Sequence, residues 1–311
     1  MTYKKRLPYR HGIPASLPAG GRWGGGCLCL LSVLLLAATS CVKDELHHTP
    51  HPDTGKIAVT ADWSGRGEGV DIPAEWTVAM GGYTGTETGG THVPDYLFSP
   101  GDYTLAVYNT PRGITITGTT ATIAPETKSG GDSFITGTPG WLLTSVQEVT
   151  VEADADYELT APMRQHVRQL TLVIESTGDA AGRIESIEGS LSGAAGTLDF
   201  AAGTYGAASD VALHFTKLTE GDDAGKWTAT VWLLGVTGGQ RLAATLAYTS
   251  GNPQDTRLES DLTEVLKDFN SSGAGSFTLS GTIAETPTEA GVEAGITGWE
   301  KIDGGGVDAE M

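Results

Sequence analysis

The chain has 311 residues, which is enough for two domains of ordinary size. It carries 38 acidic and 19 basic residues, a formal net charge of −19 at pH 7. Such a charge repels the phosphates of nucleic acids, so DNA and RNA are excluded as partners. All three cysteines lie within the first 41 positions, so the rest of the chain has no disulfide and depends on its hydrophobic core.

The first forty residues have the features of a secretory signal. They contain five basic residues and no acidic residue, followed by a mainly apolar run over residues 27–38. A run of this length is too short to span a bilayer comfortably as a permanent anchor. Positions 1–40 are therefore predicted to be a signal peptide. The remaining chain keeps fourteen basic and all thirty-eight acidic residues, a formal charge of −24.

The small residues Ala38, Thr39 and Ser40 lead directly to Cys41. This arrangement resembles a bacterial lipobox, although Ala38 stands where leucine is commonest. The resemblance implies cleavage just before Cys41 and acylation of this cysteine by palmitate-type chains, which then hold the protein on a membrane. Two or three chains are needed for permanent attachment. The alternative is an ordinary signal peptide followed by an incidental cysteine.

The segment after the cysteine, residues 41–55, is predicted to be a tether. Its residues Lys43, Asp44 and Glu45 resemble the short tag that directs lipoproteins of Gram-negative anaerobes to the outer face of the outer membrane. The alternative is a solvated start of the tether. Three histidines between positions 47 and 51 could bind a metal ion, but neighbouring prolines and the lack of a further ligand favour a flexible linker.

Residues 56–160 are predicted to form an N-terminal β-sandwich. Apolar residues alternate with polar ones over residues 57–63 and 76–80, the period of a half-buried strand. Gly81 and Gly82 offer a tight hairpin turn. Further strands are predicted over residues 103–109, 114–116, 122–123, 146–151 and 156–159, whereas the polar, glycine-rich segment 125–140 is predicted to be a long loop.

Residues 161–302 are predicted to form a second, C-terminal β-sandwich with one short helix. Strands are expected over residues 167–174, 184–191, 197–200, 212–218, 226–234, 242–248 and 277–283. The helix is expected over residues 258–269, where apolar side chains recur at helical spacing. The acidic, glycine-rich tail 303–311 is predicted to be disordered.

Enzymatic signatures are weak. The block Gly131-Asp132-Ser133-Phe134 looks like the nucleophile block of a GDS-type esterase, but such an enzyme needs a histidine base well downstream. The last histidine is His214, and no Asp-x-x-His follows Ser133. Lone His166 and His214 are expected to be core or edge residues, and no metalloprotease, Walker or dinucleotide motif is present. We therefore predict that the chain is not an enzyme and that it needs no cofactor or metal.

Several motifs together resemble the fimbrillin-associated anchor lipoproteins of Gram-negative gut and oral anaerobes. They are the lipobox cysteine with its acidic tag, the first strand ending in Asp62-Trp63, the strand PGDYTLAVYN at 100–109, QHVRQL at 165–170, and Gly298-Trp299. The resemblance covers nearly all of the chain after the signal. It implies two tandem transthyretin-like β-sandwich domains, and a role at the base of a surface pilus, bound to pilin-type stalk subunits. In pili assembled by strand exchange, residues 57–63 are expected to stay in place, because removing them would also remove the lipid.

The rival interpretation is a glycan-binding surface lipoprotein. Six tryptophans follow the signal peptide, and exposed aromatic rings could hold a sugar. Trp141, at the end of the predicted loop, is the residue expected to be exposed. Two or more coplanar exposed rings would favour glycan binding, whereas a long unpaired strand edge would favour pilus assembly. A third interpretation is a surface paralogue that takes part in no pilus.

Overall fold

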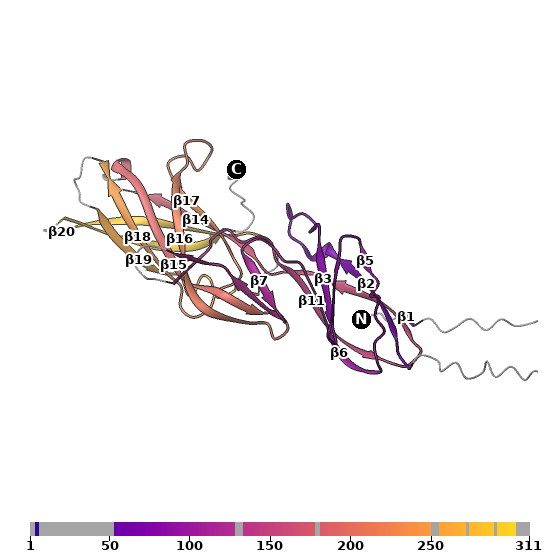
Figure 1. Ribbon diagram of the computed structural model, residues 1–311. Coiled ribbons are helices and arrows are strands. Elements are labelled where there is room, and N and C mark those ends of the chain that lie inside the picture. Colours follow the sequence, from indigo (N-terminus) through magenta and orange to yellow (C-terminus); the bar gives the residue numbers. More distant parts are fainter. Residues whose placement is uncertain are drawn as a thin grey trace, which may run out of the picture.

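The computed structural model describes residues 4–5, 53–127, 133–177, 181–249, 255–271, 274–288 and 291–302. These residues form β-strands in two lobes that lie end to end (Figure 1), with two three-residue 3-10 turns, η2 (Trp63–Gly65) and η3 (Ala181–Arg183), and no α-helix. The prediction of an all-β chain with β-sandwich architecture is confirmed. No helix in the described part is long and apolar enough to cross a membrane.

The N-terminal lobe consists of two sheets packed face to face. One has the strand order β1-β12-β2-β5 and the other β13-β11-β6-β3-β4. Strand β1 lies within the predicted signal peptide, so processing before Cys41 would leave β12 at the sheet edge. The strands are β1 (Lys4–Lys5), β2 (Lys56–Asp62), β3 (Trp76–Met80), β4 (Tyr83–Glu87), β5 (Thr91–His92), β6 (Gly101–Tyr108), β11 (Leu143–Val151), β12 (Asp156–Pro162) and β13 (Arg164–Gln165).

Burial in this lobe follows the alternation of the sequence. In β3 the side chains of Trp76, Val78 and Met80 are buried and those between them are partly exposed, because successive side chains point to opposite faces of a strand. Gly81 and Gly82 have φ angles of 56° and 85° and join β3 to β4. The predicted two-glycine hairpin is therefore confirmed, since both turn positions need a positive φ.

The C-terminal lobe is built from one continuous sheet of twelve described strands. Its main path runs β19-β18-β15-β16-β17-β14-β20-β21, and β7, β8, β9 and β10 join it at the side. The strands are β7 (Ile114–Thr117), β8 (Thr120–Ile123), β9 (Pro125–Thr127), β10 (Ser133–Ile135), β14 (Arg168–Ser176), β15 (Ile184–Asp199), β16 (Thr204–Lys217), β17 (Trp227–Leu233), β18 (Arg241–Tyr248), β19 (Thr256–Asp261), β20 (Phe277–Thr288) and β21 (Gly291–Ile302).

Strands β7 to β10 come from the segment between β6 and β11, yet they pair with the C-terminal lobe. Strand β8 pairs with β15, and β10 pairs in parallel with β16, with Phe134 opposite Asp210. The segment 125–140 therefore contains two short strands in addition to loop. Ile135 is buried in the C-terminal core, which fixes this otherwise polar segment to the lobe.

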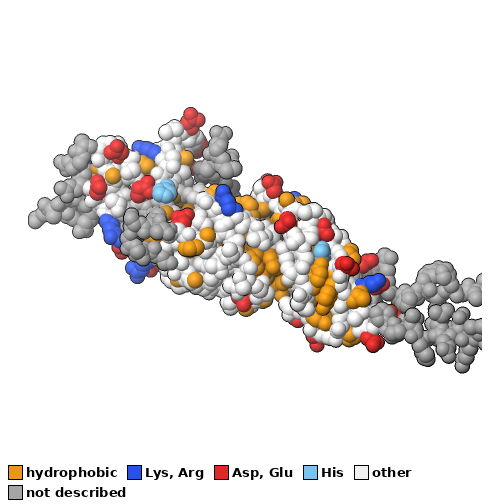
Figure 2. Space-filling view, in the orientation of Figure 1, with side chains coloured by type: hydrophobic (Ala, Val, Ile, Leu, Met, Phe, Trp, Pro, Cys, Tyr) orange, Lys and Arg blue, Asp and Glu red, His pale blue; other side chains and the backbone are white. Residues whose placement is uncertain are grey.

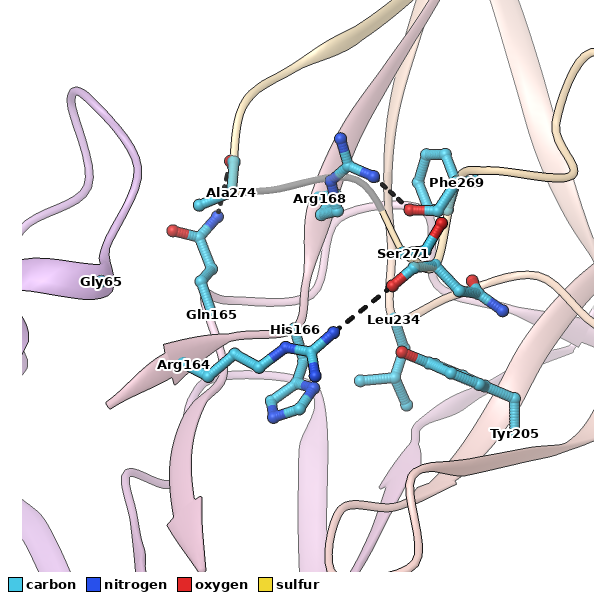
Figure 3. A pocket seen from close by; sticks show the side chains of 11 residues that line it. Gly65, Arg164, Gln165, His166, Arg168, Tyr205, Leu234, Phe269, Ser271 and Ala274 are labelled. Carbon is cyan, nitrogen blue, oxygen red and sulfur yellow. Dashed lines mark hydrogen bonds between the residues drawn. The ribbon is translucent and has the colours of Figure 1, made fainter. Parts of the chain in front are cut away.

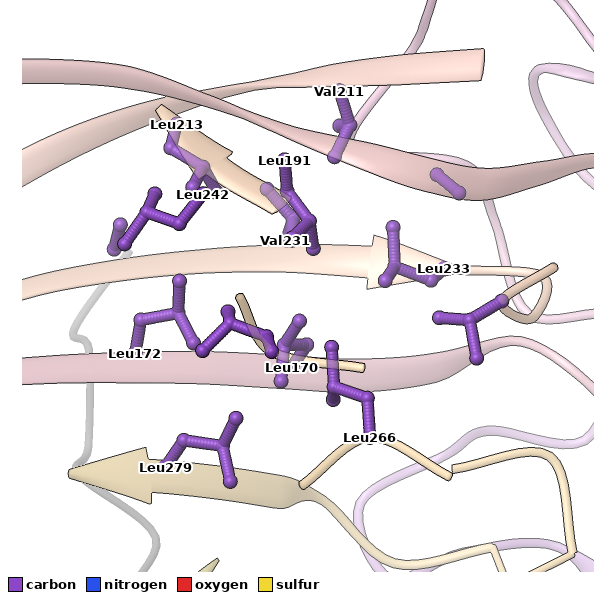
Figure 4. Packing of buried hydrophobic residues seen from close by; sticks show 14 of the residues in the cluster. Leu170, Leu172, Leu191, Val211, Leu213, Val231, Leu233, Leu242, Leu266 and Leu279 are labelled. Carbon is purple, nitrogen blue, oxygen red and sulfur yellow. The ribbon is translucent and has the colours of Figure 1, made fainter. Parts of the chain in front are cut away.

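Leucine and valine side chains from the strands of the C-terminal lobe fill its core (Figure 4). The close-up shows β14, β16, β17 and β20 directing these side chains toward one another. Leu170, Leu191 and Leu242 are fully buried, although they come from three different strands. This packing supplies the stability that a chain without disulfides needs.

The helix predicted over residues 258–269 is wrong. Leu258 lies in β19, opposite Ala244 of β18, and the residues after Asp261 form successive turns with one helix-type hydrogen bond, from the Leu266 amide to the Leu262 carbonyl. The apolar stripe is nevertheless buried, including Phe269. The helical spacing thus correctly predicted which side chains are buried, but it did not predict the backbone conformation. The first residues of the segment form a strand that pairs with β18.

Candidate functional site

The predicted lipidation residue Cys41 and the predicted export residues Lys43, Asp44 and Glu45 lie outside the described residues. The described chain starts again at Asp53, three residues before β2. Strand β2 runs parallel to β12, which leads into the C-terminal lobe. Strand β2 therefore starts at the end of the N-terminal lobe that is remote from the C-terminal lobe (Figure 1).

Strand β2 is one of the two inner strands of its sheet and lies between β12 and β5. Its seven residues pair in parallel with β12, from Lys56 to Asp62, and Val59 and Thr60 pair with β5 on the other side. The Thr60 hydroxyl lies 2.8 Å from the hydroxyl of Thr91. A strand that is hydrogen bonded on both edges and buried on one face is an integral part of the lobe.

Both ends of β2 are fixed by further hydrogen bonds. The Gly55 amide donates to the Phe98 carbonyl at 2.7 Å and its carbonyl accepts from the Phe98 amide at 3.0 Å. At the other end, the Asp62 carboxylate accepts from the Ser64 amide at 3.0 Å, and this bond lowers the pKa of Asp62. The adjoining Trp63 ring meets Trp76 edge to face at 6.4 Å.

Trp141 lies where the two lobes meet. It is half-buried, and its ring meets Trp232 of β17 edge to face, with 6.3 Å between the centroids. The buried Asn109 holds this segment, because its side-chain amide donates to the Trp141 carbonyl and its carbonyl oxygen accepts from the Leu143 amide. Asn109 ends the strand motif at residues 100–109, but nothing in that motif indicates the contacts of its side chain.

His166 lies on the short link between β13 and β14. It is buried, its Nε2 lies 2.7 Å from the Thr144 hydroxyl, and its buried Nδ1 has no hydrogen-bond partner among the described residues. Burial, helped by the positive charge of Arg164, lowers the pKa of His166 from 6.5 to about 4. His166 is thus buried and neutral at pH 7, where the sequence predicted a core or edge residue.

Gln165 ties the same link to the N-terminal lobe. Its side-chain oxygen accepts from the Gly67 amide at 2.8 Å, and its amide donates to the Val167 carbonyl. A second ring contact, between Tyr108 and Phe200 at 5.9 Å, adds to the junction. Gln165 is the first residue of the motif at 165–170, but the sequence alone assigned it no contact, because a buried link glutamine has no local signature.

Exposed apolar side chains gather on the N-terminal lobe (Figure 2). Among the described residues, four of the five large exposed ones lie between residues 72 and 97, and Tyr96 is the one aromatic residue in that set. Its ring lies 5.6 Å from that of Tyr83 at an angle of 33°. Trp63, Trp76 and Trp227 are buried in the cores. The described tryptophans therefore form no exposed, coplanar platform.

The residues weighed for catalysis do not converge. Ser133 is the first residue of β10, while Gly131 and Asp132 lie outside the described residues. His214 is exposed and contacts Glu188 at 2.7 Å on the neighbouring strand. Within the described ranges, no three His, Cys, Asp or Glu residues come together in a way that could hold a metal ion.

Comparison with known proteins adds the family. No curated protein sequence matches the chain. The fold is similar to the fimbrial anchor protein Mfa2 from Porphyromonas gingivalis, with a TM-score of 0.54 and 14% identity over 80% of this chain and 97% of that one. It is also similar to a Bacteroides ovatus protein described as a "putative adhesin", with a TM-score of 0.51 and 16% identity over 69% of this chain and 84% of that one.

The family comparison covers both lobes. The model of the fimbrillin-A associated anchor proteins Mfa1 and Mfa2 matches residues 78–303, from β3 to just beyond the last strand. That range includes the lobe junction with Trp141 and His166. Because the match extends over most of the chain, this protein belongs to the family of fimbrillin-A associated anchor proteins.

Proposed function

We propose that this protein is a lipoprotein on the outer face of the outer membrane, where it acts as the anchor or a minor subunit of a fimbria. Membership of the anchor family over residues 78–303 carries the proposal. That membership makes the chain a non-catalytic structural protein of fimbriae and cell adhesion. In this proposal Cys41, at the end of a signal-like leader, is the lipidated residue. Lys43, Asp44 and Glu45 form the signal for export to the cell surface.

The geometry of β2 supports this arrangement. A lipid at Cys41 sits about fifteen residues before β2, and β2 starts at the end of the N-terminal lobe that is remote from the C-terminal lobe. The N-terminal lobe then faces the membrane and the C-terminal lobe points away from it. Because β2 is hydrogen bonded on both edges, it resists being pulled out of the sandwich. A force on the fimbria is then transmitted through β2 and the tether to the lipid.

The partners in this proposal are pilin-type subunits of the stalk, and the lobe that meets them is the C-terminal one. The formal charge of −24 after the signal argues against direct adhesion of the surface to anionic headgroups. Acyl chains therefore supply the membrane attachment, at about 0.8 kcal/mol per buried methylene group.

Replacement of the lipidated cysteine tests the proposal. In cells fed labelled palmitate, Cys41→Ala should abolish labelling, release the protein from the membrane fraction, and shed fimbriae into the medium. The matched control is Cys29→Ala, which lies inside the leader and should leave all three unchanged. Membrane attachment of the Cys41→Ala protein would contradict the lipid anchor, and normal fimbriae on such cells would contradict the anchoring role.

A further inference from the structure

A cavity of about 380 Å³ opens at the junction of the two lobes (Figure 3). The N-terminal lobe contributes Gly65 of η2 and Arg164 of β13, and the C-terminal lobe contributes Tyr205 of β16 and the turns around Phe269. Its volume is within the range of small-ligand sites. A molecule bound here would touch both lobes.

The cavity is positively charged in a strongly acidic protein. Arg164 and Arg168 both line it, and none of its described lining residues is an aspartate or glutamate. Arg164 is exposed and forms no ion pair with a described residue. Its one hydrogen bond to a described residue is long, 3.5 Å to the Asn270 carbonyl. Most of this guanidinium is therefore available to a ligand.

Arg168 supplies a second, fixed positive charge. Its side chain is buried, donates to the carbonyls of Phe269 and Gly275, and lies 5.0 Å from the centre of the Phe269 ring. These hydrogen bonds hold the guanidinium in place. Burial lowers the pKa of Arg168, which means that the surroundings disfavour its charged form. A bound anion would relieve that cost.

Tyr205 offers a neutral donor next to the two arginines. It is half-buried, and its hydroxyl forms no hydrogen bond with a described residue. Figure 3 shows this hydroxyl and the Arg164 guanidinium pointing toward one another across the cavity. Burial raises the pKa of Tyr205, while Arg164 and Arg168 act against that rise, as expected for charges that lie close to the hydroxyl.

His166 gives a second, independent sign of an incomplete site. More than nine-tenths of the residue is buried, it lines the same cavity, and its Nδ1 has no described hydrogen-bond partner. A buried polar atom without a partner is costly. An anion beside Arg164 would offset the positive field that now acts on this ring.

We propose that this cavity binds a carboxylate group. The Arg164 fork and the Tyr205 hydroxyl supply the two or three donors that the two oxygens of a carboxylate accept, and Arg168 supplies a fixed charge behind them. The carboxylate can belong to a free organic acid, such as a sugar acid, or to an acidic side chain presented by a partner. The proposal stands on the cavity alone and does not depend on fimbrial assembly.

Calorimetric titration of the full, cell-processed protein in detergent tests the proposal. The probes are galacturonate, N-acetyl-glutamate amide and inorganic phosphate. Each is titrated at the same ionic strength, and chloride is the reference anion. We expect saturable binding of galacturonate or of the capped glutamate, and the tighter of the two identifies the source of the carboxylate. Arg164→Gln should weaken binding at least about tenfold, and Tyr205→Phe several-fold.

Arg112→Gln is the matched control. Arg112 is also exposed, and it also makes one long hydrogen bond to a carbonyl, 3.3 Å to Thr138, but it lies outside the cavity. Its replacement should leave the affinity unchanged. Absence of saturable carboxylate binding, equal affinity in the Arg164→Gln protein, or tighter binding of phosphate than of either carboxylate would overturn the proposal.

Discussion

Trp141 and Trp232 meet edge to face at the junction of the two lobes, with their ring centroids 6.3 Å apart and their planes at 82°. One ring comes from the segment that enters β11 and the other from β17. Edge-to-face contact between two such rings is favourable beyond the area that it buries. The pair therefore joins the two lobes by a direct side-chain contact.

Trp141→Ala should lower the free energy of unfolding by about 2 kcal/mol, because it removes a large, half-buried ring from the junction. Trp141→Phe keeps an aromatic ring and should cost less. Urea unfolding of Trp141→Ala, Trp232→Ala and the double variant measures the coupling. We expect a coupling energy of about 1 kcal/mol, and strictly additive effects would contradict the contact.

His166 should make the protein less stable in mild acid. Its pKa is about 4 in the folded protein and 6.5 in the unfolded chain, so only the unfolded chain takes up a proton between these values. The contribution is therefore present above pH 6.5 and is lost as the pH falls toward 4, by about 3 kcal/mol. Unfolding free energies measured between pH 7 and 4 give the slope.

One variant separates His166 from the other titrating groups. His166→Gln keeps a polar side chain near Thr144 and should flatten the slope between pH 6.5 and 4. An unchanged slope in His166→Gln would show that this histidine is not buried in its neutral form.

Val59→Asp should unfold the N-terminal lobe. Val59 is fully buried in β2, and a carboxylate there has no partner, so we expect a loss of more than about 3 kcal/mol. Thr60→Asp, one residue later on the exposed face, should cost less than about 1 kcal/mol. The fluorescence of Trp63 and Trp76 reports on this lobe. Equal effects of the two variants would contradict the register of β2.

The segment 262–271 offers a test of turn against helix. Leu266→Ala should cost about 3 kcal/mol, because the side chain is fully buried in the C-terminal core. Glu264→Gly, at an exposed position, would cost about 1 kcal/mol in a helix interior but only a few tenths in a turn. Thermal unfolding of both variants distinguishes a turn from a helix in this segment. A cost near 1 kcal/mol for Glu264→Gly would favour the helix.

Local patterns predicted most of the strands. Alternation identified β2 and β3, and the pair Gly81 and Gly82 identified the turn after β3, because these signals depend only on neighbouring residues. Pairing between distant segments has no such signal. The sequence therefore did not reveal that residues 114–135 join the C-terminal sheet, where Phe134 pairs with Asp210.

The junction was the least predictable part of the molecule. His166 was expected in the core or at an edge, and it is buried. Arg168 and Tyr205 are far apart in the sequence, and only the fold brings them to one cavity. Trp141 was expected to be exposed, but Trp232 covers part of its ring. Each contact depends on the arrangement of the two lobes, which no local pattern encodes.

The most direct test of the anchoring role is a crosslinked pull-down of this protein from intact cells, with mass spectrometry of what accompanies it. The role predicts a ladder of fimbrial subunits crosslinked mainly to the C-terminal lobe. The same pull-down from cells that lack this protein is the negative control. Recovery of the protein alone, or together with a polysaccharide transporter, would contradict the role.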